Sequence, residues 1–227
     1  MTRAAGVLRK LAWWAADYAY AAIWQLRSFA NRTDPATFQT GVGTPIVVIP
    51  GIWESWKFMQ PLITSLHDRG HPVHVVQLLR HNGRPVVDAA GHVDDYLEQH
   101  ALDDVLLVAH SKGGLIGKYV MVNGRSAPRL RGMVAVAAPF NGSFYARFMV
   151  LPSLRIFSPR NMVIRALTQD LRANSRIVSV FGQFDPHIPG GSRLDGAKNV
   201  RLDTGGHFRV LAHPRVIAEI AQMAERP

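Results

Sequence analysis

Beyond residue 40, short apolar runs alternate with longer amphipathic stretches along the chain. The run at 44–51, TPIVVIPG, is continuously apolar, which is typical of a strand buried on both faces. Residues 86–101 instead predict an amphipathic helix with Val87, Val93, Tyr96 and Leu97 on one face. The same patterns predict strands at 72–79, 104–111, 130–139, 175–182 and 199–205, and helices at 55–69, 112–124 and 214–225.

This alternation of strands and helices predicts an α/β fold: a mostly parallel central sheet of about six strands, flanked by helices. We expect one such domain over residues 41–227, preceded by a separate helical segment over 1–40. Residues 140–174 interrupt the alternation and are rich in phenylalanine and leucine. They predict a short apolar cap over a site, although helices that simply cover the sheet would need the same residues.

The N-terminal stretch 7–26 is rich in alanine and aromatic residues, and lysine and arginine flank it. Its composition predicts a helix, but Asp17 in the middle disfavours a membrane span and a signal peptide. Two interpretations remain equally open. In the first, the helix lies in a membrane interface, where Trp, Tyr and flanking cations are favoured. In the second, it packs on the protein's own sheet.

Charge and cysteine content narrow the possible partners. The 227 residues carry a formal net charge of +10 and no cysteine, so disulfides, thiolate metal sites and a cysteine nucleophile are excluded. A basic protein favours anionic partners, but no nucleic-acid-binding motif is present, and we expect no nucleic-acid partner. The absence of cysteine does not decide the compartment; cytoplasmic and peripheral membrane locations both stay open.

A candidate nucleophile lies where the third predicted strand meets a helix, in Ala109-His110-Ser111-Lys112-Gly113. A sharp strand–turn–helix elbow exposes a serine hydroxyl and points a helix N-terminus at a developing oxyanion. Strand and helix cross tightly there, so the positions two residues before and after the serine must be small. Ala109 and Gly113 satisfy this requirement, although glycine is commoner at the first position. We therefore predict Ser111 as the nucleophile.

Two backbone N–H groups are expected to form an oxyanion hole. One belongs to the residue after the nucleophile, Lys112. The other is expected in the loop after the first strand, where Gly51 allows close backbone approach and Ile52 supplies the N–H. The Lys112 side chain is interpreted either as solvated or as a positive charge near the mouth of the site.

The general base and its acid partner are expected after Ser111 in the chain. His207 follows the last predicted strand, at the sheet edge where functional loops gather, and is preferred to His187 and His213. Asp185 follows the fifth strand and is predicted to orient the imidazole and stabilise its cation. Asp203 is the second choice for the acid.

Five segments together resemble bacterial lipases and esterases of the α/β-hydrolase superfamily: VVIPGIW (47–53), AHSKGG (109–114), VAAPFNGS (136–143), FGQFDPHIP (181–189) and GGHFRVLAHP (205–214). The resemblance covers roughly residues 44–225. It departs from the lipase pattern at Phe140, where a histidine is usual. It implies the α/β-hydrolase fold, a Ser111–Asp185–His207 triad, an oxyanion hole at Ile52 and Lys112, and ester hydrolysis through an acyl-enzyme without a cofactor.

The expected activity is that of a serine hydrolase acting on a small-molecule or lipid ester, with possible membrane contact through the N-terminal segment. Two alternatives stay open: an acyltransferase or thioesterase with the same triad, and a catalytically silent protein of this fold that binds a ligand. No metal site is expected, because no His-Glu-x-x-His motif occurs, and His71 and His74 are three apart on a predicted strand.

Overall fold

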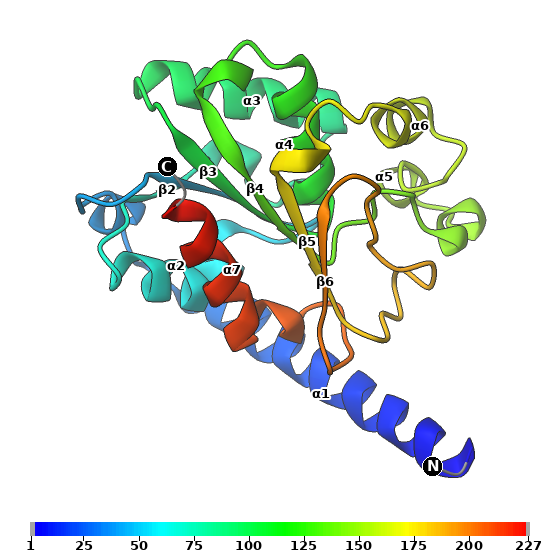
Figure 1. The fold of residues 1–227 in the computed structure, drawn as a ribbon. Helices are drawn as coiled ribbons and strands as arrows, with labels where there is room; N and C mark the ends of the chain where they lie inside the picture. The colour runs from blue at the N-terminus through cyan, green and yellow to red at the C-terminus, as the bar shows by residue number, and fades with distance from the viewer. Residues whose placement is uncertain (1–2, 226–227) are drawn as a thin grey trace.

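Six strands form one parallel sheet in the computed structural model, which describes residues 3–225 (Figure 1). The predicted fold class is confirmed. The second strand is shorter than expected, because residues 77–79 leave the sheet as a single 3-10 turn. The strands are β1 (Ile46–Ile49), β2 (Val73–Val75), β3 (Val105–His110), β4 (Leu130–Val136), β5 (Ile177–Phe181) and β6 (Lys198–Arg201).

The strand order is β2-β1-β3-β4-β5-β6. The chain runs from β1 out to the edge at β2 and then returns to place β3 on the other side of β1. Val48 of β1 therefore pairs with Val75 of β2 and with Val108 of β3. Loops that follow β1 and β3 leave the same edge of the sheet as neighbours, and open α/β sheets bind ligands at such a point of reversal.

Alternate strand residues face two separate apolar cores. Val47 and Ile49 point into one core, and Ile46 and Val48 point into the other. Helix Val86–Gln99 was predicted correctly, but Val87 was wrongly assigned to its buried face, since it is 42% exposed. The first core is covered by α3 (Val86–Gln99), α4 (Lys112–Asn123) and α6 (Met162–Gln169); the second by α1 (Arg3–Ala30), α2 (Gln60–His67) and α7 (Pro214–Ala224) (Figure 1).

The N-terminal segment is one 28-residue helix, α1. Tyr20, Ala21 and Trp24 pack against the second core, whereas the first turns extend past the body of the molecule (Figure 1). Within residues 3–225 no helix has the apolar character that a membrane span requires. The second half of α1 packs on the protein's own fold.

The segment 140–174 has two structural roles. Its last helix, α6, lies against α4 and buries Ile164 and Leu167 in the first core, as a covering helix does. Residues 144–157 instead line a pocket at the carboxyl edge of the sheet. They contain the 3-10 helix η5 (Phe144–Phe148) and the single turn α5 (Pro152–Arg155).

The remaining short 3-10 helices connect these elements. Residues 55–69, predicted as one helix, form η2 followed directly by α2. The short helices are η1 (Pro35–Phe38), η2 (Trp56–Met59), η3 (Gln77–Leu79), η4 (Ala127–Arg129), η6 (Asn174–Arg176) and η7 (Arg209–Ala212).

Candidate active site

Ser111 occupies a strained turn between β3 and α4. Its backbone has φ 50° and ψ −119°, a left-handed conformation that residues other than glycine seldom adopt. The small neighbours are required by packing: a Cβ at Gly113 would lie 2.2 Å from the Ile49 carbonyl oxygen. Ala109 is fully buried on the strand. The strand–turn–helix elbow predicted from sequence is therefore present, and strain of this kind is characteristic of functional turns.

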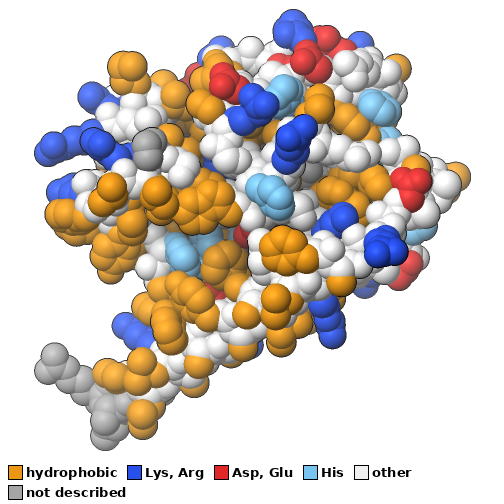
Figure 2. Space-filling view, turned by 180° about the vertical axis from the view of Figure 1, so that it is seen from behind, with side chains coloured by type: hydrophobic (Ala, Val, Ile, Leu, Met, Phe, Trp, Pro, Cys, Tyr) orange, Lys and Arg blue, Asp and Glu red, His pale blue; other side chains and the backbone are white. Residues whose placement is uncertain are grey.

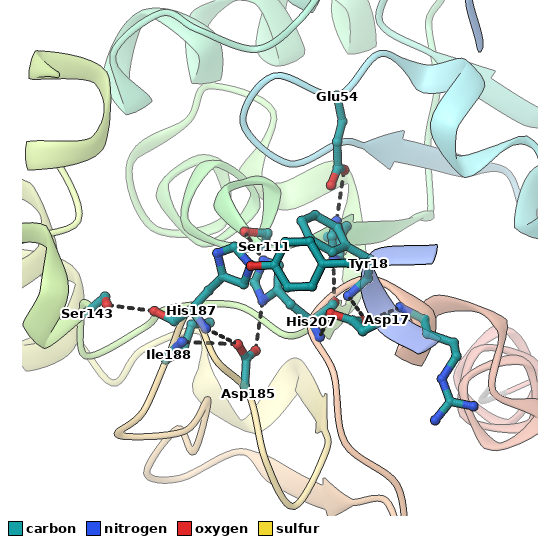
Figure 3. A network of polar contacts seen from close by, with 12 residues as sticks. Asp17, Tyr18, Glu54, Ser111, Ser143, Asp185, His187, Ile188 and His207 are labelled. Carbon is teal, nitrogen blue, oxygen red and sulfur yellow. Dashed lines mark hydrogen bonds and ion pairs between the residues drawn. The ribbon is translucent and has the colours of Figure 1, made fainter. Parts of the chain in front are cut away.

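A chain of hydrogen bonds links Ser111, His207 and Asp185 (Figure 3). Ser111 Oγ lies 3.0 Å from His207 Nε2, and His207 Nδ1 lies 2.7 Å from Asp185 Oδ2. Asp185 follows β5, and His207 lies in the loop between β6 and α7. All three residues meet at the carboxyl edge because the strands that carry them are parallel. The structure thus brings together the three predicted triad residues.

The Asp185 carboxylate is held from both sides. Its Oδ1 accepts backbone N–H groups of His187 at 2.8 Å and Ile188 at 3.0 Å, while Oδ2 faces His207. Burial raises the pKa of Asp185, but the His207 charge and hydrogen bond outweigh that effect and leave the pKa below its usual value. The carboxylate is therefore ionised at neutral pH.

Two other candidates, Asp203 and His213, lie away from the triad. The Asp203 side chain is 90% exposed and faces His213 at 3.5 Å rather than His207. His213 accepts the N–H of Arg215 and caps α7, as expected from its position before Pro214. These contacts leave Asp185 as the partner of His207.

The two predicted oxyanion donors flank Ser111 in the structure. Ile52 follows β1 and lines the same pocket as Ser111. The Gly51 N–H donates to Glu54 Oε2 at 2.8 Å and is therefore occupied, which keeps the Ile52 N–H as the predicted donor of this loop. Lys112 is the first residue of α4, and such N–H groups have no partner within their helix. The donor roles of Ile52 and Lys112 remain predictions.

Both predicted locations of the Lys112 side chain, in solvent and at the mouth of the site, are wrong. The side chain is fully buried, neither solvated nor at the mouth, and its Nζ donates to the carbonyl oxygens of Asn82 and Arg84. Burial lowers its pKa to about 8. Asn82 in turn donates to the Pro50 carbonyl at 2.6 Å, so this lysine connects α4 to the loop that carries Ile52.

A second buried pair, not predicted from the sequence, lies beneath the triad. His110 Nδ1 faces Glu54 Oε2 at 2.8 Å, and His110 Nε2 faces the His207 carbonyl oxygen at 2.9 Å. Glu54 also accepts the Gly51 N–H. The pair therefore connects the loop after β1 to the loop that carries His207 (Figure 3). The sequence signal was a histidine at the end of a strand buried on both faces, where a polar side chain needs a partner.

Asp17 was also missed as a site residue. Its carboxylate is fully buried and accepts the backbone N–H groups of His207, Phe208 and Arg209, each at 2.8 Å. α1 thus holds the backbone of the loop that carries His207. An aspartate alone among apolar helix residues was the available sequence signal, because buried acids are nearly always paired.

A mostly apolar pocket of about 390 Å³ opens above Ser111 and His207. Tyr18 of α1 borders it, and the Tyr18 hydroxyl lies 3.0 Å from His187 Nε2. Burial, and secondarily the His207 charge, lowers the pKa of His187 to about 4, so that ring is neutral at pH 7. The apolar lining includes Ile52, Tyr145, Met149, Leu154, Phe157, Ile188 and Phe208.

Among the side chains that the structure describes, no group of three or more His, Asp and Glu is placed to hold an ion. The pocket residues themselves can support proton transfer along Asp185–His207–Ser111 and binding of an apolar group.

Comparisons with known proteins agree with this fold. A model of the alpha/beta hydrolase family matches residues 46–204. The mature form of a Bacillus licheniformis lipase superposes with a TM-score of 0.66 at 16% identity, over 86% of this chain and 95% of that one. An extracellular alpha/beta-hydrolase from a Paenibacillus species has a TM-score of 0.56 at 18% identity, over 81% of this chain and 100% of that one.

A thioesterase domain from the curacin biosynthetic pathway has a TM-score of 0.53 at 13% identity, over 80% of this chain and 90% of that one. No curated protein matches the sequence significantly. At such identities the structural neighbours establish the fold and nothing finer. The family model covers most of the chain, from β1 to the loop after β6, and the resemblance seen in the sequence is confirmed: this chain belongs to the alpha/beta hydrolase family.

Proposed function

We propose that this chain is a serine hydrolase that cleaves carboxylic esters with an apolar acyl group through an acyl-enzyme. The observation that carries the proposal is the continuous chain from Ser111 Oγ through His207 to the ionised Asp185. A serine hydroxyl is a weak nucleophile until an adjacent base accepts its proton. The His207 ring is at hydrogen-bond distance and is oriented by Asp185, which meets that requirement.

The reaction proceeds in two halves. Ser111 Oγ attacks the ester carbonyl carbon while His207 Nε2 takes its proton, and Asp185 stabilises the imidazolium that forms. The N–H groups of Ile52 and Lys112 donate to the oxyanion. His207 then protonates the departing alkoxide, leaving an acyl group on Ser111, and the same base activates the water that releases the acid. Neutral His187 adds no like charge beside His207 during either half.

The pocket walls support the choice of substrate class. Apolar side chains from the 144–157 segment and from residues 186–188 face the site, and charged side chains are absent from its described lining. Such walls bind an acyl chain through burial of apolar area, while the triad handles the polar carbonyl. A lipid-like ester therefore fits better than a charged one.

The test compares two serines of the same pocket. Ser111→Ala is expected to lower hydrolysis of p-nitrophenyl acyl esters by roughly 10⁵–10⁶-fold and to abolish labelling by a fluorophosphonate probe. Ser143→Ala is the matched control, because Ser143 also lines the pocket but donates its hydroxyl to the His187 carbonyl at 2.6 Å. The control is expected to keep its labelling.

Each alternative gives a different result. Activity that survives in Ser111→Ala contradicts the proposal. An unlabelled and inactive wild-type protein favours a silent ligand-binding fold. Preference for acyl thioesters, or transfer of the acyl group to an added alcohol in place of water, favours the thioesterase or acyltransferase alternative.

A further inference from the structure

An exposed apolar stripe runs along the outward side of α1. Val7, Leu11, Trp14 and Tyr18 are spaced by four, three and four residues, so they lie on one face of the helix. Their exposed fractions are 54%, 58%, 47% and 38%. Tyr18 also lines the pocket above Ser111. The stripe therefore leads along α1 to the mouth of the site.

A second group of exposed apolar side chains borders the pocket mouth from the 144–157 segment. Tyr145 and Met149 contribute to the pocket wall and are also partly exposed. Figure 2 shows hydrophobic side chains along α1 and on the part of the surface facing it, with a recess between them. The exposed members of this group are Phe144, Tyr145, Phe148, Met149, Val150 and Leu151. We call this group and the α1 stripe together the rim face.

The rim face combines apolar area with cations. The only acidic residue in 3–30 is Asp17, which is buried under the His207 loop, and 140–165 contains no acidic residue. Arg147 and Arg155 are exposed in the segment of the apolar group, and Lys10 is exposed on the flank of α1. Arg9 and Arg27 are also exposed, but helix geometry places them on the side of α1 opposite the stripe. Large exposed apolar patches mark interaction surfaces, and the two segments that form this one carry exposed cations and no exposed acidic residue.

We propose that the rim face docks on the surface of an anionic lipid bilayer, with the pocket mouth turned toward the lipid. Trp and Tyr side chains favour the headgroup level, leucine and phenylalanine enter the acyl boundary, and arginine and lysine attract anionic headgroups. The net charge of +10 and the lack of exposed acidic residues in these segments oppose pairing with a second copy of this chain, because two such faces offer each other no opposite charge. The inference deepens the proposed function by naming where its substrate is met.

Point substitutions provide the test, because deleting α1 would also remove Asp17 from the His207 loop. Leu11→Gln with Phe148→Gln changes one exposed residue on each side of the mouth, and neither lines the pocket. The matched control is Val42→Gln with Leu171→Gln, two exposed residues in the segments that lead into β1 and β5, at the opposite edge of the sheet. All proteins are sedimented with phosphatidylcholine vesicles with and without phosphatidylglycerol.

Wild type and the control pair are expected to sediment with the anionic vesicles, and the rim pair to bind at least about tenfold more weakly. Binding should also weaken as salt is raised from 50 to about 500 mM. The rate of hydrolysis of a soluble short-chain ester tests the proposed function independently. This rate should be the same in wild type, the rim pair and the control pair.

Three outcomes would overturn the docking proposal: wild type fails to sediment with anionic vesicles, the rim pair sediments as well as wild type, or the rim pair abolishes a dimer instead of vesicle binding. Since vesicle sedimentation needs no catalysis, a protein that docks but hydrolyses nothing contradicts only the proposed function. A protein that hydrolyses soluble esters but does not dock contradicts only this inference.

Discussion

His110 faces an acceptor at each ring nitrogen. Glu54 Oε2 accepts at Nδ1, and the His207 carbonyl accepts at Nε2, so both nitrogens donate when both bonds are made and the ring is an imidazolium. Burial lowers the pKa of His110, but the Glu54 charge, the Glu54 hydrogen bond and the His207 carbonyl together raise it above its ordinary value of 6.5. A buried ion pair therefore lies beneath the triad.

This pair predicts a pH-dependent stability. Because the pKa of His110 is raised on folding, its stabilisation is fully present below about pH 6.5 and is lost as the pH rises through the folded-state pKa. Glu54→Gln removes the charge that raises the pKa of His110. Burial then dominates, lowers that pKa and opposes protonation of the His110 ring. We expect Glu54→Gln to lose roughly 3 kcal/mol of unfolding free energy at pH 6 and clearly less at pH 9, measured by chemical denaturation.

Glu98→Gln is the control for the change in charge. Glu98 lies on the surface beside Arg125, where an ion pair contributes little. The substitution Glu98→Gln is expected to change the unfolding free energy only slightly at both pH values. A loss in Glu54→Gln that is the same at pH 6 and pH 9 would show that His110 is neutral in the folded protein.

At the scale of elements, the crossing of β1 and α4 positions the nucleophile. The Gly113 backbone lies so close to β1 that a methyl group would meet the Ile49 carbonyl oxygen at 2.2 Å. Backbone atoms cannot move aside as the end of a side chain can. The start of α4, and with it Ser111, therefore depends on a residue without a side chain at position 113.

Two glycine-to-alanine substitutions in neighbouring helices should act in opposite directions. Gly113→Ala is expected to lower the unfolding free energy by about 2–3 kcal/mol and to reduce ester hydrolysis, because α4 and the elbow must shift. Gly91→Ala in α3 meets no atom within 4 Å and should raise stability by up to about 1 kcal/mol through helix propensity, without a change in activity. Thermal denaturation and initial rates measure both effects.

Equal behaviour of the two variants would contradict the tight crossing. If Gly113→Ala keeps the full unfolding free energy, α4 has room for a methyl group beside β1. Gly91→Ala serves as the control, because it makes the same change in a helix that covers the same core.

At the scale of the whole molecule, the two ends of the chain meet at the site. Asp17 in α1 and the His207 loop are 190 residues apart, yet one carboxylate accepts three consecutive N–H groups of that loop. Asp17 thus holds the backbone of the His207 loop, and we predict that it positions His207, although it lies outside the segment that the family model matches. The interfacial and self-packed interpretations of α1 concern different faces of one helix, because Asp17 and the exposed stripe lie on different sides of it.

Asp17→Ala is expected to lower kcat at least about tenfold with little change in KM, because the base loses its position while the pocket wall stays intact. Asp17→Asn keeps one carbonyl acceptor and should recover part of that loss. Steady-state kinetics on a soluble p-nitrophenyl ester separates the two constants.

Asp34→Ala is the matched control. Asp34 also accepts a backbone N–H, that of Ala36, but it caps a short helix away from the pocket. It is expected to change stability slightly and kcat not at all. If Asp17→Ala lowers the melting temperature and leaves kcat unchanged, Asp17 is structural and does not position His207.

Local sequence determined the parallel α/β architecture, because buried strands, amphipathic helices and the Ser111 elbow each follow from neighbouring residues. The chain order and strand-end placement of Asp185 and His207 were also sufficient to predict the two residues that the structure places in line with Ser111. Tertiary structure decided what depends on distant partners: the burial of Lys112, the Glu54–His110 pair and the attachment of Asp17 to the His207 loop. A local pattern can indicate that a buried polar residue needs a partner, but the identity of that partner, 28 to 192 residues away, is set by packing rather than by spacing.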